Sequence, residues 1–111
     1  MPIAMMIQEA LDEAGFRVTY APDGLAALDE SSKARFDILL TDVRMPRLDG
    51  VGLVRRLRGS RPEMPVVVLS GYMTNADREE LLRLGIPADA ILEKPVALGE
   101  LNSVLRRALE A

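Results

Sequence analysis

Three residues with different chemistry, Asp42, Ser70 and Lys94, close three apolar runs of the sequence. The runs read FDILLTD, MPVVVLS and ADAILEKP, and in each of them the polar residue is last or next to last. A carboxylate can act as a nucleophile, a hydroxyl can donate a hydrogen bond, and an ammonium group can neutralise phosphoryl charge. If the runs are neighbouring strands, this combination predicts chemistry on an anion.

Taken singly, each of these residues has an ordinary structural explanation. An Asp after a strand often bonds nearby backbone N–H groups, a Ser after aliphatic residues commonly ends a strand, and a Lys before Pro is commonly a solvated charge. Their joint placement favours the functional interpretation, because Pro46 and Pro95 also follow two of the three strand ends and fix the local backbone. The site hypothesis therefore depends on the whole set.

The pattern of the chain predicts helices that alternate with strands. Apolar residues at helical spacing predict a helix over residues 2–14, and a β-branched and aromatic run predicts a strand over 17–20. A helix over 24–33 capped by Asp23 and a strand over 36–41 follow, and then a helix after Asp49-Gly50 with Leu53, Val54 and Leu57 facing inward. Next come a strand over 64–70, a helix from Thr74 to about Leu84 closed by Gly85, and a short strand within 88–95. The final helix carries five residues on one apolar stripe: Leu98, Leu101, Val104, Leu105 and Ala108. This order is typical of an α/β fold with a parallel sheet between helices, in which functional groups lie at the carboxyl ends of the strands.

The composition limits the classes of protein that the chain can belong to. Its 111 residues suit a single domain over 1–111 with no output domain, and the formal net charge of -3 disfavours direct nucleic-acid binding, although four arginines cluster: Arg55, Arg56, Arg58 and Arg61. The chain has no Cys and no His, which excludes disulfides, thiolate metal sites and histidine general bases. No apolar stretch reaches the roughly 18 residues of a membrane span. We therefore expect no membrane association and a cytoplasmic location.

Three motifs resemble those of one family, the receiver domain of bacterial response regulators. TDVRMPRLDG looks like that family's phosphorylation segment, VVVLSGY like its fourth strand and switch hydroxyl, and ILEKPV like its Lys-Pro signature. The likeness covers essentially the whole chain. It implies a flavodoxin-like doubly wound parallel sheet, the receiver fold, and a role as the phospho-accepting component of a two-component phosphorelay.

The resemblance also implies a role for each site residue. Asp42 would be the phosphoacceptor, Ser70 the switch hydroxyl that donates to a phosphoryl oxygen, and Lys94 the cation that pairs with phosphoryl charge. Mg²⁺ would be the cofactor, bound by the Asp42 carboxylate and the backbone carbonyl of Arg44. The phosphodonor would be a histidine kinase or a histidine phosphotransfer protein. The signal would pass to an unknown downstream protein through protein contacts, and the chain would not be an enzyme.

Residues near the site complete the likeness and also depart from it. Gly71 looks like the small residue that leaves access to phosphorus, and Tyr72 occupies a position that modulates phosphoryl loss in the family. The position three before the lysine, usually Tyr or Phe in the family's switch, is Ile91. The aromatic in-and-out motion is therefore absent, and either a different readout operates or the switch is muted.

A larger departure concerns the start of the sequence. Family members begin with a hydrophobic strand that ends in an acidic pair, whereas this sequence begins where the following segment would lie, so the first strand and both Mg²⁺-binding acids are absent. We expect weak Mg²⁺ binding, slow or lost phosphorylation and an N-terminally truncated sheet. Three explanations are open: an internal Met of a longer protein, which we favour, a shift of the strand at 17–20 toward the next strand, or a dimer in which two chains complete each other's sheet.

Other functions are alternatives to phosphoryl acceptance. A degenerate receiver would act as a phosphorylation-independent protein-interaction module, a hypothesis motivated by the missing acids and by Ile91. An aspartyl-nucleophile phosphohydrolase is disfavoured, because such enzymes need a second Asp two residues after the nucleophile, where this chain has Arg44. A dinucleotide-binding domain is disfavoured because no Gly-rich fingerprint follows a strand.

Overall fold

The structure, a computed structural model, describes residues 15, 24–33, 36–43, 48–94 and 96–110. Several sequence predictions lie outside these ranges. They are the helix at 2–14, the strand at 17–20, the cap at Asp23, the absence of a first strand, and the positions of Arg44, Pro46 and Pro95.

Helices and strands alternate along the described chain, as the sequence predicts. The elements are α2 (Gly24–Lys33), β1 (Leu39–Thr41), α3 (Gly50–Ser60), β2 (Val66–Ser70), α4 (Asn75–Arg83), the 3₁₀ helix η1 (Ala88–Ala90), β3 (Ile91–Glu93) and α5 (Leu98–Glu110). The predicted helix at 24–33 is confirmed at both ends. None of the helices in the described ranges is long and apolar enough to cross a membrane.

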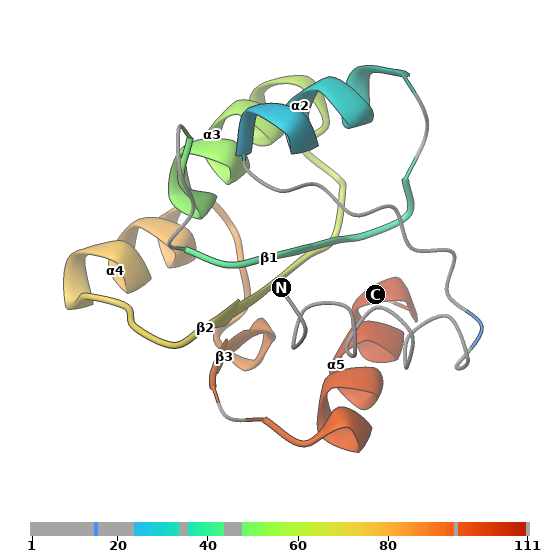
Figure 1. The fold of residues 1–111 in the computed structure, drawn as a ribbon, viewed down its shortest axis with the longest axis vertical. Coiled ribbons are helices and arrows are strands. Elements are labelled where there is room, and N and C mark those ends of the chain that lie inside the picture. The colour runs from blue at the N-terminus through green and yellow to red at the C-terminus, as the bar shows by residue number, and fades with distance from the viewer. Residues whose placement is uncertain (1–14, 16–23, 34–35, 44–47, 95, 111) are drawn as a thin grey trace.

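The three described strands form one parallel sheet in the order β1-β2-β3. Leu40 pairs with Val67, and Leu69 pairs with Leu92. Figure 1 shows α2 and α3 on one side of this sheet and α5 on the other. The predicted α/β architecture, a parallel sheet between helices, is therefore confirmed.

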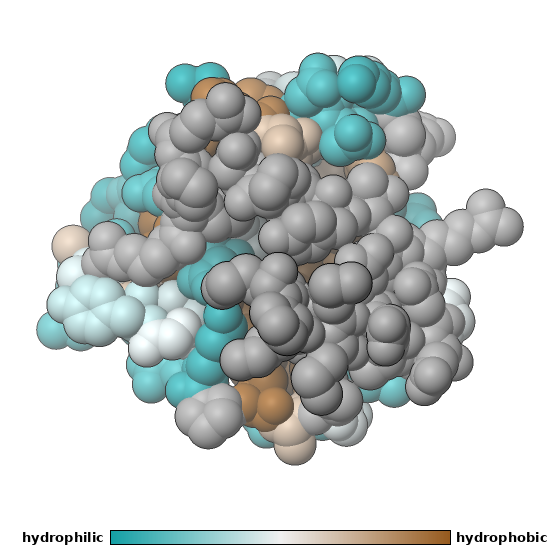
Figure 2. All heavy atoms as spheres, in the orientation of Figure 1, coloured by the Kyte–Doolittle hydropathy of each residue, from teal (hydrophilic) through white to brown (hydrophobic). Residues whose placement is uncertain are grey.

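The core follows from the apolar runs of the strands. All five residues of β2 are buried, as expected of a central strand covered on both faces. On the α3 side, Leu53, Val54 and Leu57 are at most 2% exposed, which confirms their predicted inward orientation. On the α5 side, Leu101, Val104 and Leu105 are buried, and the partly buried Ala108 packs against the same core. In the space-filling view, hydrophilic residues make up much of the described surface at the top of the molecule, where α2 and α3 lie, and apolar residues show there only in small patches (Figure 2).

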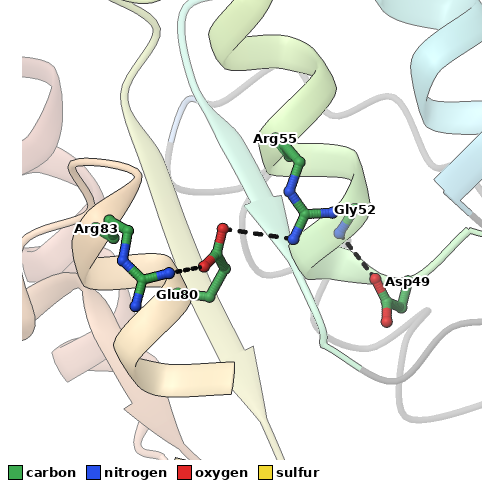
Figure 3. A network of polar contacts seen from close by, with 5 residues as sticks. All are labelled: Asp49, Gly52, Arg55, Glu80 and Arg83. Atoms are coloured by element: carbon green, nitrogen blue, oxygen red, sulfur yellow. Dashed lines mark hydrogen bonds and ion pairs between the residues drawn. The ribbon is translucent and has the colours of Figure 1, made fainter. Parts of the chain in front are cut away.

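Helices α3 and α4 start with side-chain caps. Asp49 caps α3 by accepting a hydrogen bond of 2.8 Å from the backbone N–H of Gly52 (Figure 3). Thr74 caps α4, as predicted, and forms a reciprocal capping box with Asp77. Gly85 has a φ of 91°, a left-handed conformation that favours glycine, and it follows α4 where the sequence predicts a stop.

The last strand is shorter than the sequence predicts. The segment expected to be extended from Ala88 first forms the 3₁₀ turn η1, and β3 begins only at Ile91. The backbone N–H of Ala90 donates to the carbonyl of Pro87 at 3.0 Å, which closes this turn and delays the strand. The carboxyl end of the strand is unaffected, so Lys94 still follows it directly.

Candidate functional site

The sheet brings the three predicted site residues to one edge. Asp42 follows the last residue of β1, Ser70 is the last residue of β2, and Lys94 follows the last residue of β3. Because the three strands are parallel neighbours, their carboxyl ends meet at the same side of the domain. Residues separated by up to 52 positions in the sequence thus come together through strand order alone.

Lys94 and Asp42 form an ion pair at this edge. The Nζ atom of Lys94 donates to Oδ2 of Asp42 at 2.9 Å, and the two side chains are 45% and 29% exposed. An ion pair this open to water contributes little to stability, on the order of 0 to 1 kcal/mol. Its position matters more, because it places a cation beside a carboxylate oxygen at the carboxyl edge of the sheet.

Ser70 forms hydrogen bonds with the segment that follows β2. The residue is 1% exposed, and its hydroxyl donates to the carbonyl oxygen of Tyr72 at 2.7 Å. The same oxygen accepts a longer hydrogen bond of 3.3 Å from the backbone N–H of Tyr72. The carbonyl of Ser70 in turn accepts from the backbone N–H of Lys94 at 2.8 Å. Ser70 and Lys94 are therefore joined through the main chain, while the hydroxyl of Ser70 is directed to Tyr72.

The start of α3 lies against the residues at the end of β1. The backbone N–H of Gly50, the first residue of α3, donates to the carbonyl of Val43 at 2.9 Å. A Cβ atom at position 50 would lie 2.0 Å from the carbonyl oxygen of Asp42, so only glycine fits there. The Thr41 hydroxyl also donates to this carbonyl, at 2.9 Å. In the sequence, Asp49-Gly50 indicates only where a helix starts, and it does not predict this contact.

The other residues named near the site take clear positions. Gly71 is exposed, and a Cβ atom there would meet Cδ of Lys94 at an ordinary contact distance of 3.8 Å. Tyr72 is 65% exposed. Ile91, by contrast, is 6% exposed and packs in the hydrophobic core.

The residues described here supply only part of a metal site. Mg²⁺ prefers hard oxygen ligands, usually one or two carboxylates with phosphate oxygens and water. Asp42 offers such a carboxylate, and the second predicted ligand, the carbonyl of Arg44, lies outside the described residues. Within the described ranges, no group of three or more acidic, His or Cys side chains is placed to hold a metal ion. Taken alone, these residues do not make a Mg²⁺ site.

The chain is a parallel α/β domain with a carboxylate, a hydroxyl and a lysine at the carboxyl ends of adjacent strands. Comparison with known proteins shows the family to which such a domain belongs. The chain matches the response regulator receiver domain over residues 2–106. The chain belongs to the response regulator receiver domain family.

Curated relatives are longer than this chain. Response regulator MprA of Mycobacterium tuberculosis (strain ATCC 25618 / H37Rv) is 40% identical over 103 residues, which make up 93% of this chain and 44% of that protein. Response regulator MprA of Mycobacterium leprae (strain TN) is 38% identical over the same shares. The chain thus spans less than half the length of these relatives.

Solved structures agree with the fold. A CheY-like response regulator receiver domain protein from Methanospirillum hungatei JF-1 has a TM-score of 0.91 at 23% identity, covering 98% of this chain and 86% of that one, and this likeness shows the fold alone. The receiver domain of a sensor histidine kinase from Pseudomonas aeruginosa PAO1 is 31% identical with a TM-score of 0.85, and the match covers 100% of this chain and 92% of that one. That structure has a magnesium ion coordinated in its active-site cleft.

Proposed function

We propose that the chain is a phosphoryl acceptor in a two-component phosphorelay and that Asp42 is the accepting residue. The observation that carries the proposal is the distance of 2.9 Å between Nζ of Lys94 and Oδ2 of Asp42, at the edge of the sheet where Ser70 also ends its strand. Family membership supports this assignment, because the three residues stand in the motifs TDVRMPRLDG, VVVLSGY and ILEKPV.

The chemistry would be one displacement at phosphorus. A carboxylate oxygen of Asp42 attacks the phosphorus of a phosphohistidine, a P–O bond forms, and the P–N bond breaks with its electron pair returning to the imidazole. The ammonium group of Lys94 neutralises charge on the transferred group, and the hydroxyl of Ser70 can donate to one of its oxygens. The product is an acyl phosphate on Asp42, and the chain acts as an acceptor rather than as an enzyme with turnover.

Mg²⁺ is the proposed cofactor. Its role, when bound, would be to neutralise charge on the phosphoryl oxygens. Asp42 would be one ligand and the carbonyl of Arg44 another. The magnesium-bound receiver from Pseudomonas aeruginosa, at 31% identity, supports this part of the proposal.

The proposed partners follow from the same chemistry. A histidine kinase or a histidine phosphotransfer protein would supply the phosphoryl group, and a downstream protein would read the modified state. Direct contact with nucleic acid is not proposed for this domain, because its net charge is -3.

Intact-mass spectrometry tests the proposal. The chain is incubated with acetyl phosphate and Mg²⁺, and we expect a gain of one phosphoryl group that is absent in Asp42→Asn. The matched control is Asp49→Asn, which changes another carboxylate of the same loop region, one whose side chain caps α3. Because weak Mg²⁺ binding is expected to slow the uptake, the adducts are compared after long incubation at high concentrations of Mg²⁺ and acetyl phosphate. Equal adducts in all three proteins, or none in the wild type under these conditions, would count against the proposal.

A degenerate receiver is the second candidate function. The burial of Ile91 favours it, because the strand position that usually carries a switch aromatic holds an aliphatic core residue. Such a domain would bind its partner equally well as wild type and as Asp42→Asn. A strong loss of partner binding in that variant would exclude this candidate.

A further inference from the structure

The hydroxyl of Ser70 cannot donate a hydrogen bond to a phosphoryl group and to Tyr72 at the same time. A serine hydroxyl has one proton to donate, and in this structure it donates to the carbonyl oxygen of Tyr72 at 2.7 Å. Donation to a phosphoryl oxygen would be charge-assisted and therefore stronger than donation to a neutral carbonyl. Phosphorylation of Asp42 would thus take this hydrogen bond away from Tyr72.

The segment that loses the bond lies between two anchored points. Ser70 is buried at the end of β2, and Met73 packs against the hydrophobic core just before the cap of α4. Only Gly71 and Tyr72 lie between them, and both are exposed. A change in the bonding of Ser70 therefore acts first on these two residues.

The helix α4 is held in place independently of Ser70. The capping box of Thr74 and Asp77 fixes its first turn, and the side chain of Leu81, in its last turn, is fully buried. Near its other end, the guanidinium of Arg58 donates to the carbonyl of Leu84 at 3.0 Å and to that of Met64 at 2.6 Å. The capping box is internal to α4, whereas Leu81 and Arg58 hold its carboxyl-terminal half against the rest of the domain.

An ion-pair network adds a further link between α3 and α4. Glu80 of α4 lies between Arg83 of the same helix and Arg55 of α3, and it contacts the latter at 3.4 Å (Figure 3). The carboxylate is only 24% exposed, whereas the two arginines are mostly exposed. Glu80 thus adds a contact between α4 and α3 that does not involve Asp42, Ser70 or Lys94.

We propose that Tyr72 is the residue that reports phosphorylation to a partner, in place of an aromatic residue on β3. Ile91 is aliphatic and buried in the core, whereas Tyr72 is 65% exposed and its carbonyl accepts a hydrogen bond from the hydroxyl of Ser70. On phosphorylation, the backbone of Gly71 and Tyr72 changes and the ring moves, while α4 keeps its place. This inference deepens the proposed function and depends on it.

Tyrosine fluorescence of the full chain tests the proposal. The sequence contains two tyrosines and no tryptophan, so Tyr20→Phe leaves Tyr72 as the only strong emitter. We expect the emission of Tyr20→Phe to change on addition of acetyl phosphate and Mg²⁺, in proportion to the phosphoryl adduct measured by mass. Hydrogen exchange of α4 should stay the same. A full adduct with unchanged Tyr72 emission, or with strong deprotection of α4, would overturn the proposal.

A variant without the hydroxyl provides the second arm. Tyr20→Phe/Ser70→Ala lacks the bond to Tyr72, so we expect its emission to differ from Tyr20→Phe before any phosphodonor is added, and the amide of Tyr72 to exchange several-fold faster. Per mole of adduct, the phosphodonor should then cause little further change. Identical resting emission and exchange in the two proteins would contradict the proposal. Absence of any adduct in Tyr20→Phe would instead contradict the phosphoryl-acceptor function itself.

Discussion

The first residue of α3, Gly50, packs against the carbonyl oxygen of Asp42 so closely that a Cβ atom would lie 2.0 Å from that oxygen. The N–H of Gly50 also donates to the carbonyl of Val43 at 2.9 Å. The start of α3 and the backbone of the predicted phosphoacceptor are thus in direct contact. The position of Asp42 therefore depends on the absence of a side chain eight residues later in the sequence.

Gly50→Ala tests this dependence. The added methyl group meets backbone atoms that cannot rotate away, so we expect a loss of unfolding free energy of about 1–3 kcal/mol or more, as in other overpacked sites. Phosphoryl uptake should fall as well, because the clash displaces Asp42. Denaturant unfolding and intact-mass spectrometry measure the two effects.

Gly59→Ala is the matched control in the same helix. A Cβ atom at position 59 meets nothing within 4 Å, so we expect this variant to gain about 0.5–1 kcal/mol from the better helix former. Wild-type stability in Gly50→Ala, or equal losses in both variants, would show that the close approach to Asp42 has no energetic consequence.

Lys94→Ala separates function from stability. Its ion pair with Asp42 is partly exposed, so we expect the unfolding free energy to change by no more than about 1 kcal/mol. Phosphoryl uptake should fall roughly 100-fold, because a cation aimed at developing charge is lost. The rate of adduct formation with acetyl phosphate measures this loss.

Lys33→Ala is the control for the charge change. It removes the same charge from an exposed ion pair with Asp29 at 3.0 Å, on α2. Uptake should be unchanged in this variant. A similar loss of uptake in both variants would mean that net charge, rather than the position of Lys94, controls the reaction.

Leu81→Ala tests the anchoring of α4 on the core. Leu81 is fully buried, so its truncation should cost about 2–5 kcal/mol of unfolding free energy. The neighbouring Leu82 is 41% exposed, and Leu82→Ala should cost about 1 kcal/mol or less. Denaturant unfolding distinguishes the two, and a larger loss in Leu82→Ala would contradict the orientation of α4 described here.

Arg58→Ala tests the tie at the end of α4. Burial lowers the pKa of this guanidinium, but the group stays charged at neutral pH and donates to the carbonyls of Leu84 and Met64. Its removal takes one donor from each of these two part-buried carbonyls, which should lower the unfolding free energy by about 1–3 kcal/mol. Arg56→Ala, on the exposed side of α3, should change stability by about 0.5 kcal/mol at most. Equal thermal unfolding curves for both variants would contradict this account.

The arrangement of the strands could be predicted because it follows from simple patterns. A run of aliphatic residues such as 66–69 indicates a strand buried on both faces, and parallel strands place their carboxyl ends together. Those two facts were enough to predict that Asp42, Ser70 and Lys94 lie at one edge. The roles of these residues stay predictions until phosphorylation is measured.

Contacts made by individual atoms could not be predicted in the same way. The bond from the hydroxyl of Ser70 to the carbonyl of Tyr72 depends on the path of a loop, and the approach of Gly50 to Asp42 depends on how a helix docks. The two hydrogen bonds that Arg58 donates to backbone carbonyls join segments up to 26 residues apart. None of these leaves a periodic or compositional trace in the sequence. The 3₁₀ turn before Ile91 was missed for a similar reason, because a short apolar run does not show where a strand begins.

The most direct test of the central claim identifies the residue that carries the phosphoryl group. The wild-type chain is treated with acetyl phosphate and Mg²⁺, and borohydride then reduces the acyl phosphate, which converts the modified aspartate into homoserine. Peptide mapping by mass spectrometry locates that conversion. We predict homoserine at position 42 alone and none in Asp42→Asn. Conversion at another acidic residue, with Asp42 intact, would contradict the account.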